Sequence, residues 1–115
     1  MNLRFTPAMH LKSEKQISAL FKTGKSVSSF PIRVRYLPTQ GATNKAAFTV
    51  SKRLFKSAVD RNHIKRLLRE AYRTQKAELN SDGTNFVMLF IYVDKAPATY
   101  ERVAKAIKQV LNKIE

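Results

Sequence analysis

The chain has 115 residues, with 22 Lys and Arg against 8 Asp and Glu, which leaves a net charge of +14. This length suits one domain, and 43% hydrophobic residues are enough for a core. The absence of cysteine excludes a disulfide framework, a zinc ribbon and a thiol nucleophile. The longest apolar run, 86–93, is far shorter than the ~20 residues of a membrane span, and residues 1–10 lack the apolar core of a signal peptide. We therefore expect a soluble cytoplasmic protein without a membrane partner.

The N-terminal part of the chain predicts a short helix. Ser13, with Gln16 three residues later, has the form of a capping box. Apolar residues then recur at helical spacing at Ile17 and Phe21, and Gly24 stands where a C-terminal cap would stand. These signals predict a helix over roughly residues 13–23.

Two strands with alternating character follow this helix. Apolar residues occupy every second position over 32–36, in a strand that ends at Pro38, and again over 46–51 after a turn at 41–44. A weaker pattern at 26–29 is consistent with a short edge strand. One face of the two strands is apolar and holds Ile32, Val34, Tyr36, Phe48 and Val50. The opposite face is small and basic and holds Arg33, Arg35, Ala47, Thr49 and Ser51.

A long helix, a buried strand and a final helix complete the chain. Apolar residues fall at helical spacing from Ile64 to Leu79, and Ser57 precedes Asp60 by three residues, as a helix cap would. The unbroken apolar run 86–93 predicts a strand buried on both faces, hence central in its sheet. Residues 100–114 form an amphipathic helix. The order α-(β)-β-β-α-β-α predicts an α+β fold in a single domain over residues 1–115.

Positive charge is concentrated between Lys52 and Lys76, where nine cations face two acids and half of the net charge lies. At 100° per residue, six cations and one asparagine of the long helix fall within an arc of about 140° that contains no acid. We call it the basic arc; it holds Arg61, Asn62, Lys65, Arg66, Arg69, Arg73 and Lys76. Cations at i,i+4 repel by a few tenths of a kcal/mol per pair, which a bound polyanion relieves. The predicted RNA-binding residues are the basic arc with Lys52, Arg53 and Lys56.

The charge pattern alone leaves other classes of protein open. A ribosomal or other structural RNA-binding protein shares it, because electrostatic attraction to nucleic acid is not sequence-specific. A DNA-binding helix is a second alternative, although no helix directly upstream completes a helix-turn-helix. A solvated helix face would mix Glu with Lys, and a membrane-surface helix would need the apolar face that the core requires.

A metal-dependent nuclease acting alone is a further alternative. The chain has two histidines, His10 and His63, and no nucleophile or third partner is apparent beside the pair Asp60 and His63. The carboxylates show no metal-ligand spacing, and no glycine-rich phosphate loop is present. We therefore expect no catalytic residue and no metal site within the chain itself.

The basic strand end Val50-Ser51-Lys52-Arg53 is followed by Ala58-Val59-Asp60-Arg61-Asn62-His63-Ile64-Lys65-Arg66-Leu67-Leu68-Arg69-Glu70-Ala71-Tyr72-Arg73. This segment closely resembles the signature of the bacterial ribonuclease P protein component. Leu20-Phe21-Lys22 with Gly24 is similar to the family's first helix and turn. The strand after residue 84 and the final helix also fit, so the resemblance spans nearly the whole chain.

This resemblance implies a function. The family's small basic protein joins a large catalytic RNA, which cleaves the 5′ leader from precursor tRNA with magnesium bound mainly by the RNA. The protein contacts that RNA and holds the leader in a cleft between the first helix and the sheet. The resemblance also implies an α-β sandwich with a left-handed βαβ crossover, where a right-handed one is usual. We expect the chain to be a monomer in the absence of RNA. The implied leader cleft holds Ile17, Phe21, Arg33, Arg35, Ala47, Thr49 and Ser51.

The small, basic sheet face agrees with such a cleft, because a single strand needs cations for its phosphates and clearance above the sheet. A solvent-facing polar face is the simpler alternative for the same residues.

Three departures from the family pattern bear on this resemblance. His63 replaces the usual arginine, residues 54–57 lack the common glycine, and Ile17 with Phe21 replaces a pair of phenylalanines, which leaves one aromatic platform fewer for a leader base.

Overall fold

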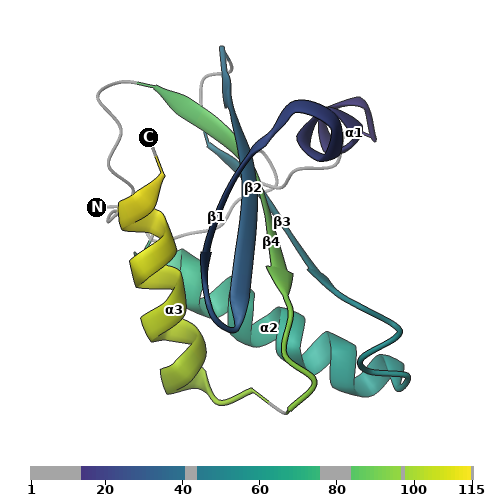
Figure 1. The fold of residues 1–115 in the computed structure, drawn as a ribbon. Helices are drawn as coiled ribbons and strands as arrows, with labels where there is room; N and C mark the ends of the chain where they lie inside the picture. The colour runs from purple at the N-terminus through teal and green to yellow at the C-terminus, as the bar shows by residue number, and fades with distance from the viewer. Residues whose placement is uncertain (1–13, 41–43, 76–83, 97, 115) are drawn as a thin grey trace.

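The computed structural model describes residues 14–40, 44–75, 84–96 and 98–114 (Figure 1). The elements in chain order are α1 (Glu14–Thr23), β1 (Lys25–Ser29), β2 (Ile32–Thr39), β3 (Lys45–Val50), α2 (Ala58–Gln75), β4 (Asn85–Tyr92) and α3 (Tyr100–Lys113). Every element predicted from the sequence is confirmed, including the weak strand at 26–29. The predicted cap at Ser13, most of the turn at 41–44 and the end of the long helix lie outside the described residues.

The four strands form one mixed sheet in the order β1-β2-β4-β3. β2 is antiparallel to β1 and β4, whereas β3 runs parallel to β4. The prediction that the apolar run is a central strand is therefore confirmed. The strand that begins at Ile32 was predicted to end at Pro38. This prediction is wrong by one residue, since Pro38 pairs with Phe86 and β2 continues to Thr39. β1 reaches only to Tyr36, so Pro38 lies where β2 has a neighbour on one side, a position that tolerates proline.

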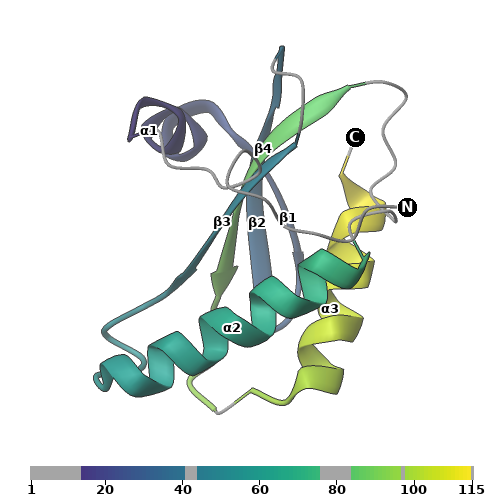
Figure 2. The same ribbon diagram turned by 180° about the vertical axis from the view of Figure 1, so that it is seen from behind.

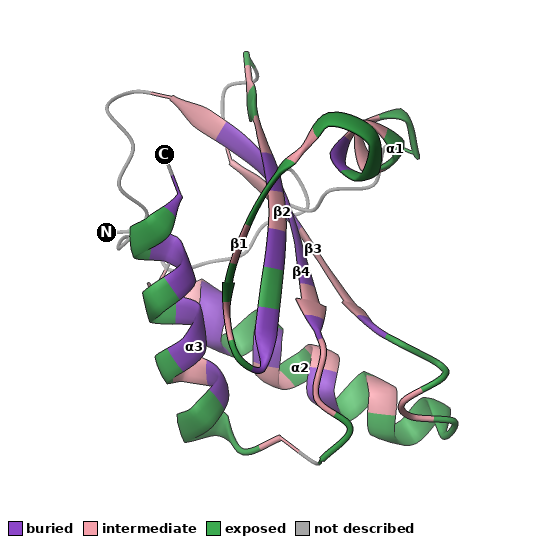
Figure 3. Ribbon diagram, viewed as in Figure 1, coloured by how far each residue is buried: buried purple, intermediate pink, exposed green. Residues whose placement is uncertain are grey.

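Helices cover both faces of the sheet. α2 and α3 pack on the face that carries Ile32, Val34 and Tyr36, and they bury the larger core with it. α1 lies on the opposite face, where Leu20 meets Val87 and Leu89 in a second, smaller core. Figure 3 shows the buried residues of α3 on the side toward the sheet and its exposed residues on the other side. Because strand side chains alternate between the two faces of the sheet, the buried residues form two separate cores.

The β3-α2-β4 unit is a left-handed crossover. β3 and β4 run in the same direction, and Figure 2 shows α2 crossing the near face of the sheet between them. With the strands turned to point upward in that view, β4 lies to the left of β3. A step to the left across the near face is left-handed, as the family resemblance implied and against the usual right-handed preference.

Aromatic rings fill the contact between α2 and the sheet. The ring of Tyr72 lies 5.8 Å from the ring of Phe48 and 5.3 Å from that of Phe90, measured between centroids. Phe48 and Phe90 stack on each other at 5.2 Å. Burial raises the pKa of the Tyr72 phenol, because the charged form would lose its hydration.

Candidate nucleic-acid interface

The basic arc lies on the part of α2 that the core leaves uncovered. Ile64, Leu68 and Tyr72 point into the larger core. Asn62, Arg66 and Arg69 are exposed and Lys65 is half-buried, whereas Lys76 lies outside the described residues. His63 is exposed too, on the outer side of the helix, where the helical wheel places it beyond the arc. The arc therefore presents guanidinium groups to solvent at successive turns, a suitable surface for phosphates.

Arg61 differs from the other members of the arc, because its guanidinium hydrogen-bonds to the protein's own backbone. Its Nη1 donates hydrogen bonds to the carbonyl oxygens of Phe55, at 2.8 Å, and Lys56, at 2.9 Å. The guanidinium is half-buried and ties the loop before α2 to the helix. The sequence pattern grouped Arg61 with the phosphate-binding cations, whereas the geometry gives it a positioning role.

Arg73, at the far end of the described arc, forms an ion pair with Glu70. Arg73 Nη2 lies 3.0 Å from Glu70 Oε1, and Arg73 Nε donates to Glu70 Oε2 at 3.1 Å. The hydrogen bond from Arg73 lowers the pKa of the Glu70 carboxyl, with a smaller contribution from the charge of Arg69. Glu70 lies outside the basic arc, where the helical wheel places it, but its carboxylate reaches Arg73 because i,i+3 neighbours are close on the helix surface.

The loop between β3 and α2 adds cations beside the start of the helix. Lys52, Arg53 and Lys56 are all exposed. The loop turns through hydrogen bonds from the backbone N–H groups of Leu54 and Phe55 to the carbonyl oxygen of Ser51. No non-glycine residue of the described segments has a positive φ, so the loop turns without the glycine common in the family.

Ser57 ends this loop as the cap of α2. Its Oγ accepts a hydrogen bond from the N–H of Asp60 at 3.4 Å, as the sequence predicted. The loop and the helix that carry the predicted RNA-binding residues are therefore joined by this cap and by Arg61.

The two apolar residues predicted for the leader cleft have different environments. Ile17 packs against the second core, whereas Phe21 is 54% exposed. Phe21 is therefore available as a stacking platform and belongs to neither core. The guanidinium of Arg35 lies 5.7 Å from the centroid of its ring.

Arg35 also closes the end of α1. Its Nε donates to the carbonyl oxygen of Leu20 at 2.9 Å, and its Nη2 donates to that of Phe21 at 3.1 Å. The last carbonyls of a helix lack partners within the helix, and a cation there complements the helix dipole. Arg35 therefore holds α1 on the sheet, rather than lining an open cleft as a phosphate ligand.

The other residues predicted for the leader cleft also differ in how exposed they are. Ala47 packs against the second core under α1. Arg33 and Ser51 are exposed and Thr49 is half-buried. Register places Arg33 and Thr49 on either side of Ile91, two residues along the strands from the row in which Arg35 and Ala47 flank Leu89. Phe21, Arg33, Thr49 and Ser51 are the members of the predicted cleft that remain accessible.

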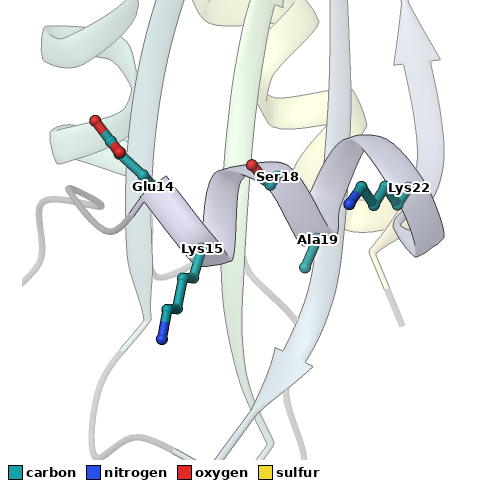
Figure 4. Close-up of a pocket in the computed structure, with 5 residues that line it drawn as sticks. All are labelled: Glu14, Lys15, Ser18, Ala19 and Lys22. Carbon is teal, nitrogen blue, oxygen red and sulfur yellow. The ribbon is translucent and has the colours of Figure 1, made fainter.

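An open hollow of about 430 Å³ lies along α1 (Figure 4). It is lined by Glu14, Lys15, Ser18, Ala19 and Lys22. None of these residues belongs to the second core or to the predicted leader cleft. The hollow combines one carboxylate with two ammonium groups, and we assign no ligand to it.

One aromatic residue that no sequence pattern singled out is prominent on the surface. Phe30, at the turn between β1 and β2, is 65% exposed, and the guanidinium of Arg102 lies 5.2 Å from its ring centroid. The only sequence signal was a large apolar residue between the serine-rich stretch Ser26–Ser29 and Pro31. The partner Arg102 is distant in the sequence, so spacing could not reveal the pair.

Two further findings concern the described residues. None of the helices there is long and apolar enough to cross a bilayer. No group of three or more His, Asp or Glu side chains comes together there in a way that could hold a metal ion.

Comparison with known proteins agrees with this architecture. The profile of the family described as Ribonuclease P matches residues 5–115. The ribonuclease P protein component of Borrelia hermsii is 33% identical over 101 residues, covering 88% of this chain and 87% of the relative. That of Caldanaerobacter subterraneus is 31% identical over 104 residues, covering 90% and 86%.

Solved structures show the same fold. The RNase P protein from Thermotoga maritima superposes with a TM-score of 0.80 at 22% identity, covering 92% of this chain and 97% of that one. The Staphylococcus aureus RNase P protein gives 0.76 at 23% identity, covering 91% and 94%. The sequence profile, the relatives and the fold agree, and the chain belongs to the ribonuclease P protein family.

Proposed function

We propose that this chain acts as the protein subunit of a ribonuclease P, binding the catalytic RNA and the 5′ leader of precursor tRNA during tRNA 5′ maturation. The observation that carries the proposal is the exposed set Arg66, Arg69 and Asn62, next to the exposed cations of the loop before α2. A net charge of +14 favours binding to a polyanion, and the family's relatives are named as protein components of ribonuclease P.

The proposal assigns binding and positioning to the chain and the cleavage chemistry to the RNA. We propose that the Mg²⁺ of the holoenzyme is bound mainly by the RNA, and no step is assigned to a metal on the side chains of this chain.

The leader is proposed to cross the accessible part of the sheet beside α1. Phe21 offers an aromatic face, Arg33 offers a cation, and the small side chains of Thr49 and Ser51 leave room for a backbone. Stacking of one base on an aromatic ring contributes roughly 1–3 kcal/mol. Arg35 and Ile17 support this surface from below and are not proposed as contacts.

The salt dependence of binding to the catalytic RNA tests the main interface. In the double variant Arg66→Ala/Arg69→Ala, we expect the plot of log K against log salt to flatten by roughly one to two units, because fewer counterions are released. Lys15→Ala/Lys22→Ala removes the same charge from α1 and is the matched control, for which the slope should not change. An unchanged slope in the α2 variant would place the catalytic RNA elsewhere.

The leader site is tested by comparing precursor and mature tRNA in the assembled holoenzyme. Phe21→Ala and Arg33→Ala should weaken binding of precursor tRNA by about tenfold and leave mature tRNA unaffected. Both side chains are exposed, so the thermal midpoint should change little. An equal loss for both tRNAs would contradict the leader assignment while leaving the basic arc in place.

A further inference from the structure

We propose that Phe30, at the tip of the β1–β2 hairpin, is a second platform on which an unpaired RNA nucleotide stacks. This inference rests on the proposed function, since it takes RNA as the partner. It extends the interaction surface to another part of the molecule. That part contains none of the basic arc and, of the residues predicted for the leader cleft, only Arg33.

The ring of Phe30 is exposed and held in place at the same time. Arg102 covers part of it, with the guanidinium carbon 5.2 Å from the ring centroid. Arg102 is itself fixed by an ion pair, in which its Nη1 lies 2.8 Å from Asp94 Oδ2. Asp94 in turn accepts a hydrogen bond from the N–H of Ala96 at 3.1 Å. The chain of contacts orders the ring before any ligand arrives, which reduces the entropy cost of binding.

The hairpin that carries Phe30 is anchored to α3. Lys113 Nζ donates to the carbonyl oxygen of Ser28 at 2.9 Å, and Ser29 hydrogen-bonds to Gln109 through their side chains. Figure 1 shows β1 beside α3, with the hairpin tip at the lower end of β1 and β2. The platform therefore stands on a strand pair held by a helix, and not on a free loop.

The charge around the ring favours a polyanion. The described length of α3 carries four cations and one acid, Glu101. Arg102, Lys105 and Lys113 fall within an arc of about 80° on the side that contacts the hairpin. On the other face of the sheet, Arg33 is exposed and lies three residues from Phe30. An aromatic face flanked by cations is the combination by which proteins bind single-stranded nucleic acid.

A purely structural role for Phe30 is the competing explanation. A ring that serves only to cover Arg102 would bury its area, yet 65% of Phe30 remains exposed. Exposed aromatic surface at a turn adds little to folding, whereas the same surface can accept a base. The open part of the ring is therefore the part that the fold does not use.

The absence of tryptophan from the chain makes a direct test possible. Phe30→Trp and Phe21→Trp each place a single indole at one of the two platforms, in otherwise complete protein. We expect single-stranded RNA to quench the indole of Phe30→Trp, because a stacked base quenches it, and a blunt duplex at equal phosphate concentration to leave it unchanged. Emission that stays constant while anisotropy of a labelled oligonucleotide reports saturation would overturn the proposal.

A second pair of variants keeps the test independent of the indole. Phe30→Leu keeps an apolar side chain beside Arg102 but cannot stack, and should bind single-stranded RNA about tenfold more weakly at an unchanged thermal midpoint. Tyr100→Leu is the matched control, since Tyr100 is an exposed aromatic on α3, the helix that carries Arg102. Equal losses in the two variants, or no loss in Phe30→Leu, would refute a specific platform.

The assembled holoenzyme then identifies the source of the nucleotide. Quenching of Phe30→Trp by the catalytic RNA alone assigns an unpaired segment of that RNA, whereas quenching that requires precursor tRNA with a long leader assigns the leader. Either result supports the platform. Quenching of Phe21→Trp without quenching of Phe30→Trp would support the proposed leader site and reject the second platform. Quenching of Phe30→Trp alone would support the second platform and count against the proposed leader site.

Discussion

Arg35 Nε lies 2.9 Å from the carbonyl oxygen of Leu20, so a strand residue completes the end of the first helix. Leu20 is fully buried against β4, and the same residue thus contributes its side chain to the second core and its carbonyl to Arg35. The sequence pattern predicted Arg35 as an RNA contact, whereas the structure makes it part of the scaffold that holds Phe21 in position.

Arg35→Ala should therefore destabilise the protein. It removes two charge-assisted hydrogen bonds to helix-end carbonyls, and we expect the free energy of unfolding to fall by about 1–2 kcal/mol. Urea unfolding measures this loss. Arg33→Ala is the control on the same strand face, and its exposed side chain predicts a change within about 0.5 kcal/mol. Equal stability of the two variants would show that the Arg35 contacts contribute nothing.

Arg61→Ala should lower stability more than Arg69→Ala, although both remove one arginine from α2. The carbonyl oxygens of Phe55 and Lys56 lose their donor in the first variant, at an expected cost of about 1–2 kcal/mol. Arg69 is exposed, so its removal should act mainly on the salt dependence of RNA binding. Chemical unfolding and RNA titration of both variants separate the two roles, and identical stabilities would argue against a positioning role for Arg61.

Glu70→Gln should strengthen binding to the catalytic RNA. Glu70 holds Arg73 in an ion pair at 3.0 Å and offsets its charge. Without the carboxylate, Arg73 can turn to a phosphate, and the salt slope should steepen by up to about one unit. Glu101→Gln removes the same charge from α3 and is the control for a general charge effect. A slope that changes equally in both variants would mean that the Glu70–Arg73 pair plays no specific part.

Burial of Tyr72 predicts a loss of stability in alkaline solution. Burial raises its pKa in the folded state above the ordinary value of 10.0. A raised pKa means that the folded state keeps the proton longer than the unfolded state does. The stabilisation is therefore complete below about pH 10 and falls as the pH rises further, by up to about 1.4 kcal/mol per pH unit for one group.

Tyr72→Phe should remove this part of the pH dependence, because phenylalanine keeps the ring contacts with Phe48 and Phe90 and has no proton to lose. Unfolding free energies measured between pH 9 and 11 for both proteins make the comparison. If the variant loses stability as steeply as the parent, the alkaline transition belongs to another group, such as Tyr92, whose pKa burial also raises.

The sequence alone determined the elements and much of the charged surface, because both follow from local periodicity. The alternation at 32–36 and 46–51 and the apolar run 86–93 predicted three of the four strands and the central position of β4. The spacing from Ile64 onward placed α2 and, through 100° per residue, the exposed positions of Arg66 and Arg69. These quantities depend only on neighbours along one element.

Only the tertiary structure decided which charged and aromatic side chains remain available to a ligand. Arg35 meets the end of α1, fifteen residues away, and Arg102 meets Phe30 at the hairpin tip. Periodicity assigns a residue to a face but does not say which carbonyl, carboxylate or ring the fold brings to that face. Phe21 is exposed and Ile17 is packed for the same reason, since the position of α1 on the sheet is set by the burial of Leu20 against β4.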